Sequence, residues 1–293
     1  LDEGATVPFI SRYRKEVTGG LDDTQMRQLE ERLRYLREME ERRQTILFSI
    51  SDQGKLTPSL EESIRTADTK SRLEDLYLPY KQKRRTKAMI AREAGLEPLA
   101  DALIENPALD PETAAAGYLN ADAGFADAKA ALDGAKQILM ERFAEDADLL
   151  ARLRDFLQAQ SLLAARVVAG KEQEGAKFSD YFEHTEAYRS VPSHRALAML
   201  RGRSEGVLTL DLRLSAEESP LDAHPCEAMI ASHWQIQDKG RAADKWLREV
   251  VRWTWRVKLL THLQSDLLTQ LRESAELEAI KVFGSNLKDL LLA

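Results

Sequence analysis

Apolar residues recur every three or four positions along most of the chain, which is the spacing of amphipathic α-helices. The clearest stretch runs from residue 22 to residue 50, where one face is marked by Met26, Leu29, Leu33 and Leu36. Glutamate and arginine fill the positions between these apolar residues, so the opposite face suits water. The pattern predicts one long helix here.

Helix-start signals predict further helices. Thr57-Pro58 is an N-cap residue followed by proline at the first helical position, and Pro192-Ser193 opens a helix that ends near Gly202. The longest predicted helix covers residues 238–272, and a last helical segment starts near Ser274.

Residues 207–214 have a different period. Leucine occupies every second position, and Thr209, Asp211 and Arg213 lie between the leucines. This alternation is typical of a β-strand, and it is the only convincing strand in the sequence. Because one strand cannot satisfy its own backbone hydrogen bonds, we expect it to pair with a weakly marked segment or with something outside the chain.

Composition supports a mainly α fold made of several helical subdomains. Charged residues make up 31% of the 293 residues and aromatic residues only 6%, which suits charge-faced helices better than a β-sandwich. The single cysteine, Cys226, excludes a disulfide framework within one chain and fits a reducing cytoplasm. No apolar run approaches the roughly 20 residues of a membrane helix, so we predict no contact with a membrane.

The sequence predicts no enzyme, no metal site and no cofactor. The five histidines form no paired metal motif, and no glycine-rich phosphate loop is present. His224 and Cys226 are two residues apart with a proline between them, which is poorly suited to a nucleophile and its base. A metal-dependent nuclease needs clustered carboxylates, and none is recognisable.

The overall charge is −7, so any affinity for nucleic acid must come from local patches. The stretch from Lys239 to Lys258 contains seven basic and two acidic residues, a net charge of +5. At a constant ~100° per residue, the core stripe of this helix contains Trp246, Val250, Trp253, Val257, Leu260, Leu267 and Leu271. The opposite stripe contains Arg241, Lys245, Arg248, Arg252 and Arg256. Trp255 is then expected among the arginines.

A row of guanidinium groups beside an exposed tryptophan can follow phosphates while a base stacks on the ring. The pattern therefore favours single-stranded nucleic acid as a ligand of this face. The alternative is a solvated face on which a neighbouring domain covers Trp255.

A second basic patch lies in residues 81–87, directly after an apolar stop. Its five basic residues are Lys81, Lys83, Arg84, Arg85 and Lys87. Such a patch can contact phosphates without reading sequence, and a solvated loop is the alternative. From Glu97 to Asp155 the charge reverses, with 13 acidic and 5 basic residues.

Ile90, Ala91, Gly95 and Leu96 have the spacing of a helix-turn-helix. The second helix of that element carries Glu97, Asp101 and Glu105, which phosphates repel. We therefore expect two packed helices here, and DNA reading is the alternative.

Four stretches together resemble the N-terminal region of the Tex family of bacterial transcription accessory proteins. They are VPFISRYRKEVTGGLDD (Val7 to Asp23), LEDLYLPYKQKRRTKAMIAREAGLEPLA (Leu73 to Ala100), SHRALAMLRGRSEGVL (Ser193 to Leu208) and AIKVFGSNLKDLLLA (Ala279 to Ala293). The resemblance covers essentially the whole chain. It implies a helical region with a helix-turn-helix-like subdomain and a long central helix, related to a eukaryotic elongation factor that travels with RNA polymerase.

The same resemblance implies that a ribonuclease-H-like domain, a helix-hairpin-helix module and an RNA-binding OB-fold domain follow this region in complete Tex proteins. It supplies no catalytic residue. We expect three stretches: an N-terminal helical subdomain (1–95), a helical bundle (96–190), and a helix, short strand and long central helix (191–293).

The sequence therefore predicts a non-catalytic helical scaffold that adds a basic contact surface for RNA or DNA within the complete protein. The alternative is a protein-interaction scaffold, with RNA polymerase as a candidate partner, that does not bind nucleic acid directly.

Overall fold

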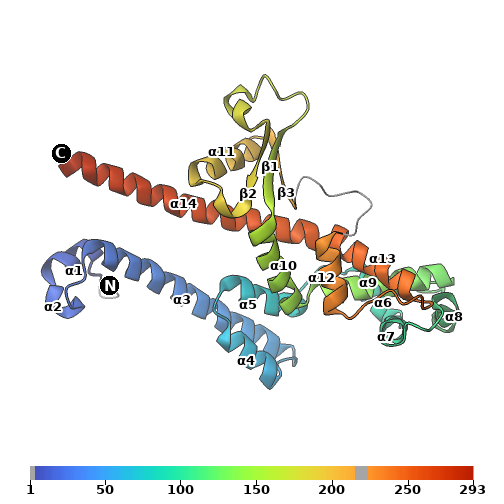
Figure 1. Cartoon of the computed structure of the whole chain (residues 1–293). Coiled ribbons are helices and arrows are strands. Elements are labelled where there is room, and N and C mark those ends of the chain that lie inside the picture. Colours follow the sequence, from blue (N-terminus) through green and yellow to red (C-terminus); the bar gives the residue numbers. More distant parts are fainter. Residues whose placement is uncertain (1–3, 215–223, 293) are drawn as a thin grey trace. The chain divides into compact units, whose positions relative to one another are not determined.

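The computed structural model describes residues 4–214 and 224–292, and it is mainly helical with one small β-sheet (Figure 1). The chain forms two compact units, residues 1–82 and 83–293. This division does not coincide with the three expected stretches, because α6 (Lys87–Glu93) packs on α9 (Ala128–Ala144) in the second unit. Residues 83–95 thus belong with the helical bundle.

The first unit is entirely helical over its described residues. Its helices are α1 (Val7–Tyr13), α2 (Lys15–Thr18), α3 (Asp23–Asp52), α4 (Pro58–Thr66) and α5 (Lys70–Tyr77), followed by a 3-10 turn at Leu78–Tyr80. The side chain of Asp22 accepts a hydrogen bond from the backbone N–H of Gln25. The side chain of Gln25 in turn accepts one from the backbone N–H of Asp22, so a capping box starts α3. Thr57 caps α4 as expected.

The core of the first unit lies around the C-terminal half of α3. Met39, Ile46, Ile50, Ile64 and Leu73 are buried there. Fewer apolar side chains are buried in the N-terminal half of α3 than its sequence pattern predicted. Met26 is buried, but Leu29 and Leu36 are 49% and 45% exposed. Helical spacing predicted this helix correctly, but it did not predict how much of the helix is packed.

The second unit begins with a bundle of helices around α9. The bundle contains α6, α7 (Glu97–Glu105), α8 (Pro111–Ala115), α9, α10 (Ala147–Gln160), α12 (Pro225–His233) and α13 (Asp244–Trp253). Leu99, Ile138 and Phe143 are fully buried in it, and the Phe143 ring stacks on Trp234 at 4.5 Å. The helices α6 and α7 are joined by a tight turn at Gly95, whose φ of +84° favours glycine. Both helices pack on α9, and DNA reading by this pair stays a prediction.

A three-stranded antiparallel sheet follows α10, with the order β2-β1-β3. The strands are β1 (Leu162–Val167), β2 (Glu183–Ala187) and β3 (Leu208–Arg213). The predicted strand at 207–214 is β3. The weakly marked partner that it required is β1, in which Leu162 pairs with Arg213 and Val167 pairs with Leu208. The helix α11 (Ser193–Ser204) packs on β3.

One continuous helical stretch ends the second unit. It consists of α13, a π-helical segment at Thr254–Leu259, and α14 (Leu260–Leu292). The expected boundary between residues 272 and 274 is therefore wrong, since α14 runs through it. The predicted start at residue 238 is also too early, because α13 begins at Asp244.

Candidate nucleic-acid interface

The basic run at 81–87 is held partly by ion pairs. In the second unit, Lys83 pairs with Glu145, the C-cap residue of α9, and Arg85 pairs with Glu93 of α6. Arg84 and Lys87 are exposed and have no ion-pair partner among the residues described. Lys81 is exposed in the first unit. The expectation of an accessible basic loop holds for part of the run only.

Two carboxylates at the C-terminal end of α9 anchor this segment, Glu141 in its last turn and Glu145 as its C-cap. Glu141 accepts hydrogen bonds from Arg92 (2.6 Å) and from the hydroxyl of Thr86 (2.9 Å). Burial by itself would raise the pKa of Glu141, but these bonds outweigh burial and lower the pKa. At Glu145 burial dominates and raises the pKa, although Lys83 acts in the opposite direction. The segment therefore approaches α6 in a fixed position rather than as a free loop.

The basic residues of the long helix are also divided between paired and unpaired groups. Arg241 donates to Asp244 at 2.8 Å, and Arg248 lies 3.0 Å from Asp238. Arg256 lies 3.5 Å from the largely buried Glu227. The pair of Arg248 with Asp238 is exposed, and exposed pairs are weak. Arg256 also keeps about half of its side chain exposed, whereas Arg241 is held by a buried carboxylate.

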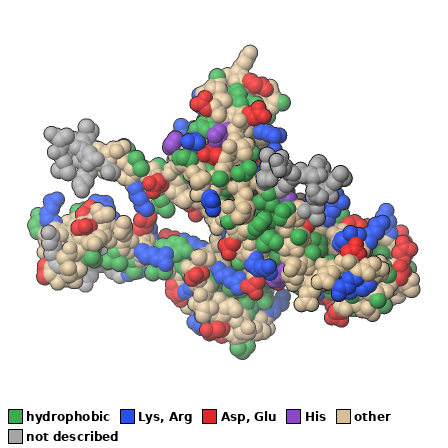
Figure 2. Space-filling model, in the orientation of Figure 1, with side chains coloured by type: hydrophobic (Ala, Val, Ile, Leu, Met, Phe, Trp, Pro, Cys, Tyr) green, Lys and Arg blue, Asp and Glu red, His purple; other side chains and the backbone are tan. Residues whose placement is uncertain are grey.

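Lys245 and Arg252 remain as exposed cations without an ion pair to any described residue. They lie four residues before and three residues after Glu249, so all three side chains share one face of α13. This face is the accessible part of the predicted arginine stripe. On the face shown in Figure 2, basic and acidic side chains are interspersed, so positive charge is gathered only locally.

Trp255 does not lie among the arginines, and that expectation is wrong. Its side chain is only 2% exposed and stacks on the imidazole of His224 at 4.6 Å. The buried face of α13 contains Leu247 and Val251, and Trp255 follows Val251 at the same spacing of four residues. Trp255 therefore continues this buried face, and the predicted core stripe was centred on the wrong residues.

Two residues that were predicted to be core are exposed. Trp253 is 45% exposed and Val257 is 50% exposed, whereas Val250 and Leu267 are fully buried as expected. The sequence Trp253-Thr254-Trp255 contains one accessible and one buried tryptophan, and the predicted assignment reversed them. A local pattern that assumes a regular helix gives no signal of this reversal.

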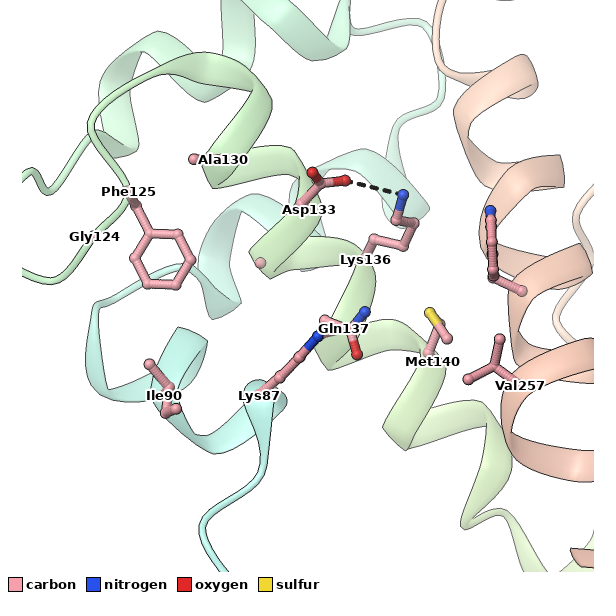
Figure 3. A pocket seen from close by; sticks show the side chains of 12 residues that line it. Lys87, Ile90, Gly124, Phe125, Ala130, Asp133, Lys136, Gln137, Met140 and Val257 are labelled. Atoms are coloured by element: carbon pink, nitrogen blue, oxygen red, sulfur yellow. Dashed lines mark ion pairs between the residues drawn. The ribbon is translucent and has the colours of Figure 1, made fainter.

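Trp253 and Val257 line a groove of about 610 Å³ in the second unit. Its other walls come from the start of α6, the turn at 124–125 and α9. Figure 3 shows Phe125 and Ile90 on one side of the groove and Met140 and Val257 on the other, with Lys87 and Gln137 between them. Lys87 of the basic run and Trp253 of the long helix, which are far apart in sequence, thus line the same hollow.

Asp133, the acidic side chain that lines the groove, is ion-paired. Lys136 pairs with Asp133 and with Glu249, each at 3.0 Å. Partial burial would lower the pKa of Lys136, but the two carboxylates outweigh burial and raise the pKa. Lys87 has no such partner among the described residues, so its ammonium group remains available at the groove.

Nothing in the described part of the chain groups three or more histidine, cysteine, aspartate or glutamate residues as metal ligands. Across the same residues, no helix is both long and apolar enough to cross a membrane.

Comparison with known proteins places this structure in a family. A family model described as Tex-like protein N-terminal domain matches residues 1–51, and one described as Tex central region-like matches residues 106–283. The second match alone covers more than half of the chain.

Individual relatives agree with these matches. Protein tex of Bordetella pertussis is 60% identical over 298 residues, and Transcriptional accessory protein Tex of Neisseria gonorrhoeae is 56% identical over 294 residues. Each alignment covers 100% of this chain and 38% of the relative, so the chain spans well under half the length of these proteins. S1 RNA-binding domain-containing protein 1 of Homo sapiens is 29% identical over 296 residues, covering 98% of this chain and 29% of that protein. The resemblance seen in four stretches of sequence is confirmed, and the chain belongs to the Tex family.

Proposed function

We propose that residues 83–293 form a helical scaffold that contributes a basic contact surface for RNA or DNA within a transcription accessory protein. The surface consists of Arg84, Lys87, Lys245 and Arg252, supported by the ion-paired Arg248 and Arg256. One observation carries the proposal: the two basic segments of the second unit meet at one groove, where Lys87 and Trp253 are both wall residues.

Charge and kinship support this reading together. Cations without an ion-pair partner can release counterions from phosphates, whereas partnered ones contribute less. Relatives of the chain are named as transcription accessory and S1 RNA-binding proteins. Phosphate contacts carry no base information, so we expect affinity with little sequence preference.

The test is salt-titrated binding of oligonucleotides to the 293-residue chain and to its Lys245→Glu/Arg252→Glu variant. These positions are better choices than Arg248 or Arg256, whose reversal leaves Asp238 or Glu227 beside a new negative charge. We expect binding at low salt to weaken at least about ten-fold and the salt slope to fall by about 1.4, from about 0.7 per lost contact to a single strand.

The matched control is Arg201→Glu/Arg203→Glu on α11, which changes the charge equally at exposed positions. It should bind like the unmodified chain. Unchanged binding by a folded Lys245→Glu/Arg252→Glu variant removes this surface from consideration. Absence of binding by the unmodified chain favours the protein-interaction scaffold instead.

A further inference from the structure

The groove beside Trp253 has the features of a binding site. Trp253 and Val257 lie one turn apart, and both stay about half exposed although they line a hollow with Ile90, Phe125 and Met140. Large apolar side chains gathered at a concave surface mark ligand sites more often than plain surface. The π-helical segment begins directly after Trp253, and such segments occur frequently at functional sites.

The wall opposite Trp253 is built by close packing. A Cβ atom at Gly134 of α9 would lie 2.9 Å from Cε1 of Phe125 and 2.4 Å from Cδ1 of Leu96. Glycine at this position therefore lets the Phe125 ring rest against the helix. Leu96 is fully buried, so this side of the groove is fixed before any ligand arrives.

The polar groups in the groove are few and differ in their availability. The Lys87 ammonium has no ion-pair partner, and the side-chain amide of Gln137 has no hydrogen-bond partner, among the described residues. Figure 3 shows these two side chains close together between the apolar walls. Asp133 and Glu249, by contrast, are both paired with Lys136.

We propose that this groove receives one unstacked base of a single-stranded nucleic acid. The base stacks on Trp253, its polar edge faces the Gln137 amide, and Lys87 contacts the adjoining phosphate. A flat apolar ring, an amide with both donor and acceptor, and a cation are the three groups that one nucleotide uses in single-strand recognition.

This inference rests on the proposed function and adds a selectivity to it. Bases in a duplex are paired and stacked, so none can enter the groove without disrupting the helix. The basic surface alone contacts single and double strands alike. The groove therefore makes the second unit prefer single strands. The unpaired ammonium group of Lys87 can contact a phosphate, which favours a nucleic acid over an apolar peptide.

The experiment compares a single-stranded oligoribonucleotide of about 12 nucleotides with the duplex of the same sequence, using fluorescence anisotropy and the 293-residue chain. Trp253→Ala should weaken single-strand binding at least about five-fold and duplex binding less than about two-fold. Trp253→Phe keeps an aromatic ring and should retain most of the affinity. Phe283→Ala, which removes an exposed ring from α14, is the matched control.

Tryptophan fluorescence gives a second measurement if Trp253→Ala does not fold. Trp253 is the most accessible of the four tryptophans, so the oligonucleotide should quench the unmodified chain and quench Trp253→Phe much less. Equal quenching in both proteins overturns the inference.

Two further outcomes separate this inference from the proposed function. In the first, the Lys245→Glu/Arg252→Glu variant loses binding but Trp253→Ala weakens single-strand and duplex binding equally. This result supports the basic surface and contradicts the base site. In the second, the charge variant binds like the unmodified chain, which contradicts both the basic surface and the base site that rests on it. Quenching of Trp253 by an acidic aromatic peptide and not by the oligonucleotide overturns the base site in favour of a protein ligand.

Discussion

A single carboxylate fixes the start of α13. Asp244 accepts the backbone N–H groups of Lys239 at 2.8 Å and of Arg241 at 2.9 Å, and its side chain is almost completely buried. The hydrogen bond from the Arg241 guanidinium has the largest effect on this carboxyl, and together with the backbone bonds it lowers the pKa of Asp244 to about 2. Asp244 thus holds the loop that leads into the basic face of the helix.

The Asp244→Asn substitution should make the free energy of unfolding less dependent on pH. The folded-state pKa of Asp244 lies below its unfolded value of about 3.9, so the ionised carboxylate stabilises the fold fully above about pH 4. That stabilisation is lost as the pH falls toward about 2. The variant should therefore unfold at lower urea concentration than the unmodified chain at pH 7, and the difference should shrink toward pH 2.

Urea denaturation at a series of pH values measures this effect. Asp122→Asn is the control, because Asp122 is exposed and makes no ion pair within the described residues. A constant difference between Asp244→Asn and the unmodified chain from pH 7 to pH 2 would contradict the role given to the carboxylate.

At the residue scale, sequence predicts short-range relations better than long-range ones. The cap residues Asp22 and Thr57 were predictable because each bonds to a backbone N–H three residues away. The partners of Lys83 and Lys136 were not predictable, because Glu145 is 62 residues and Glu249 is 113 residues from them. The sequence therefore indicates where basic residues cluster, but it could not indicate which of them are ion-paired.

At the scale of elements, the π-helical segment keeps the buried face of the long helix continuous. Buried side chains recur four residues apart at Leu247, Val251, Trp255, Leu259 and Leu263. A regular helix advances 3.6 residues per turn, so a strict spacing of four drifts around its surface. The surplus residue of the π-helical segment corrects this drift and keeps one face of the helix on the core.

A deletion tests this explanation. Removing Lys258 from the π-helical segment should convert it to regular α-helix and leave the residues on either side in phase. Removing the exposed Ser265 from α14 instead rotates Leu267 and Leu271 by about 100° relative to Leu263. We expect the first deletion to unfold near the temperature of the unmodified chain.

The second deletion should be destabilised by several kcal/mol, because exposing a buried leucine costs about 1.5–3 kcal/mol. Circular dichroism melting curves compare the two proteins. Equal loss of stability in both deletions would show that the π-helical segment is not a tolerated insertion.

Two of the three strands lacked a recognisable pattern. Residues 162–167 read Leu-Leu-Ala-Ala-Arg-Val, and three consecutive residues are buried because β1 is the central strand. A short apolar run of this kind cannot be distinguished from a helical turn by its period. The outer strand β2 is mainly polar. Only β3 alternates clearly, so only β3 was predictable.

At the scale of the whole molecule, the two units have separate cores. Ile50 is fully buried in the first unit and Phe143 is fully buried in the second. Ile50→Ala should cost about 2–5 kcal/mol and Phe143→Ala about 3–5 kcal/mol. We expect each substitution to speed amide hydrogen exchange mainly within its own unit.

Hydrogen exchange followed by mass spectrometry measures the exchange rate of each segment. The segments α4 and α5 report on the first unit, and α9 and α10 report on the second. The two variants act as controls for each other. A rise in exchange of equal size throughout the chain in both variants would mean that the units unfold as one.

The small sheet of the second unit has two outer strands, and each presents a backbone edge to its surroundings. On β3, the Gln264 amide of α14 donates to the carbonyl oxygen of Leu210 at 2.9 Å, which occupies part of that edge. On β2, Glu183 and Glu186 place carboxylates along the strand, and Glu186 pairs with Arg195 at 3.0 Å. Charged or occupied edges disfavour the addition of a strand from another molecule. A sheet this small is thereby protected from edge-to-edge aggregation at high concentration.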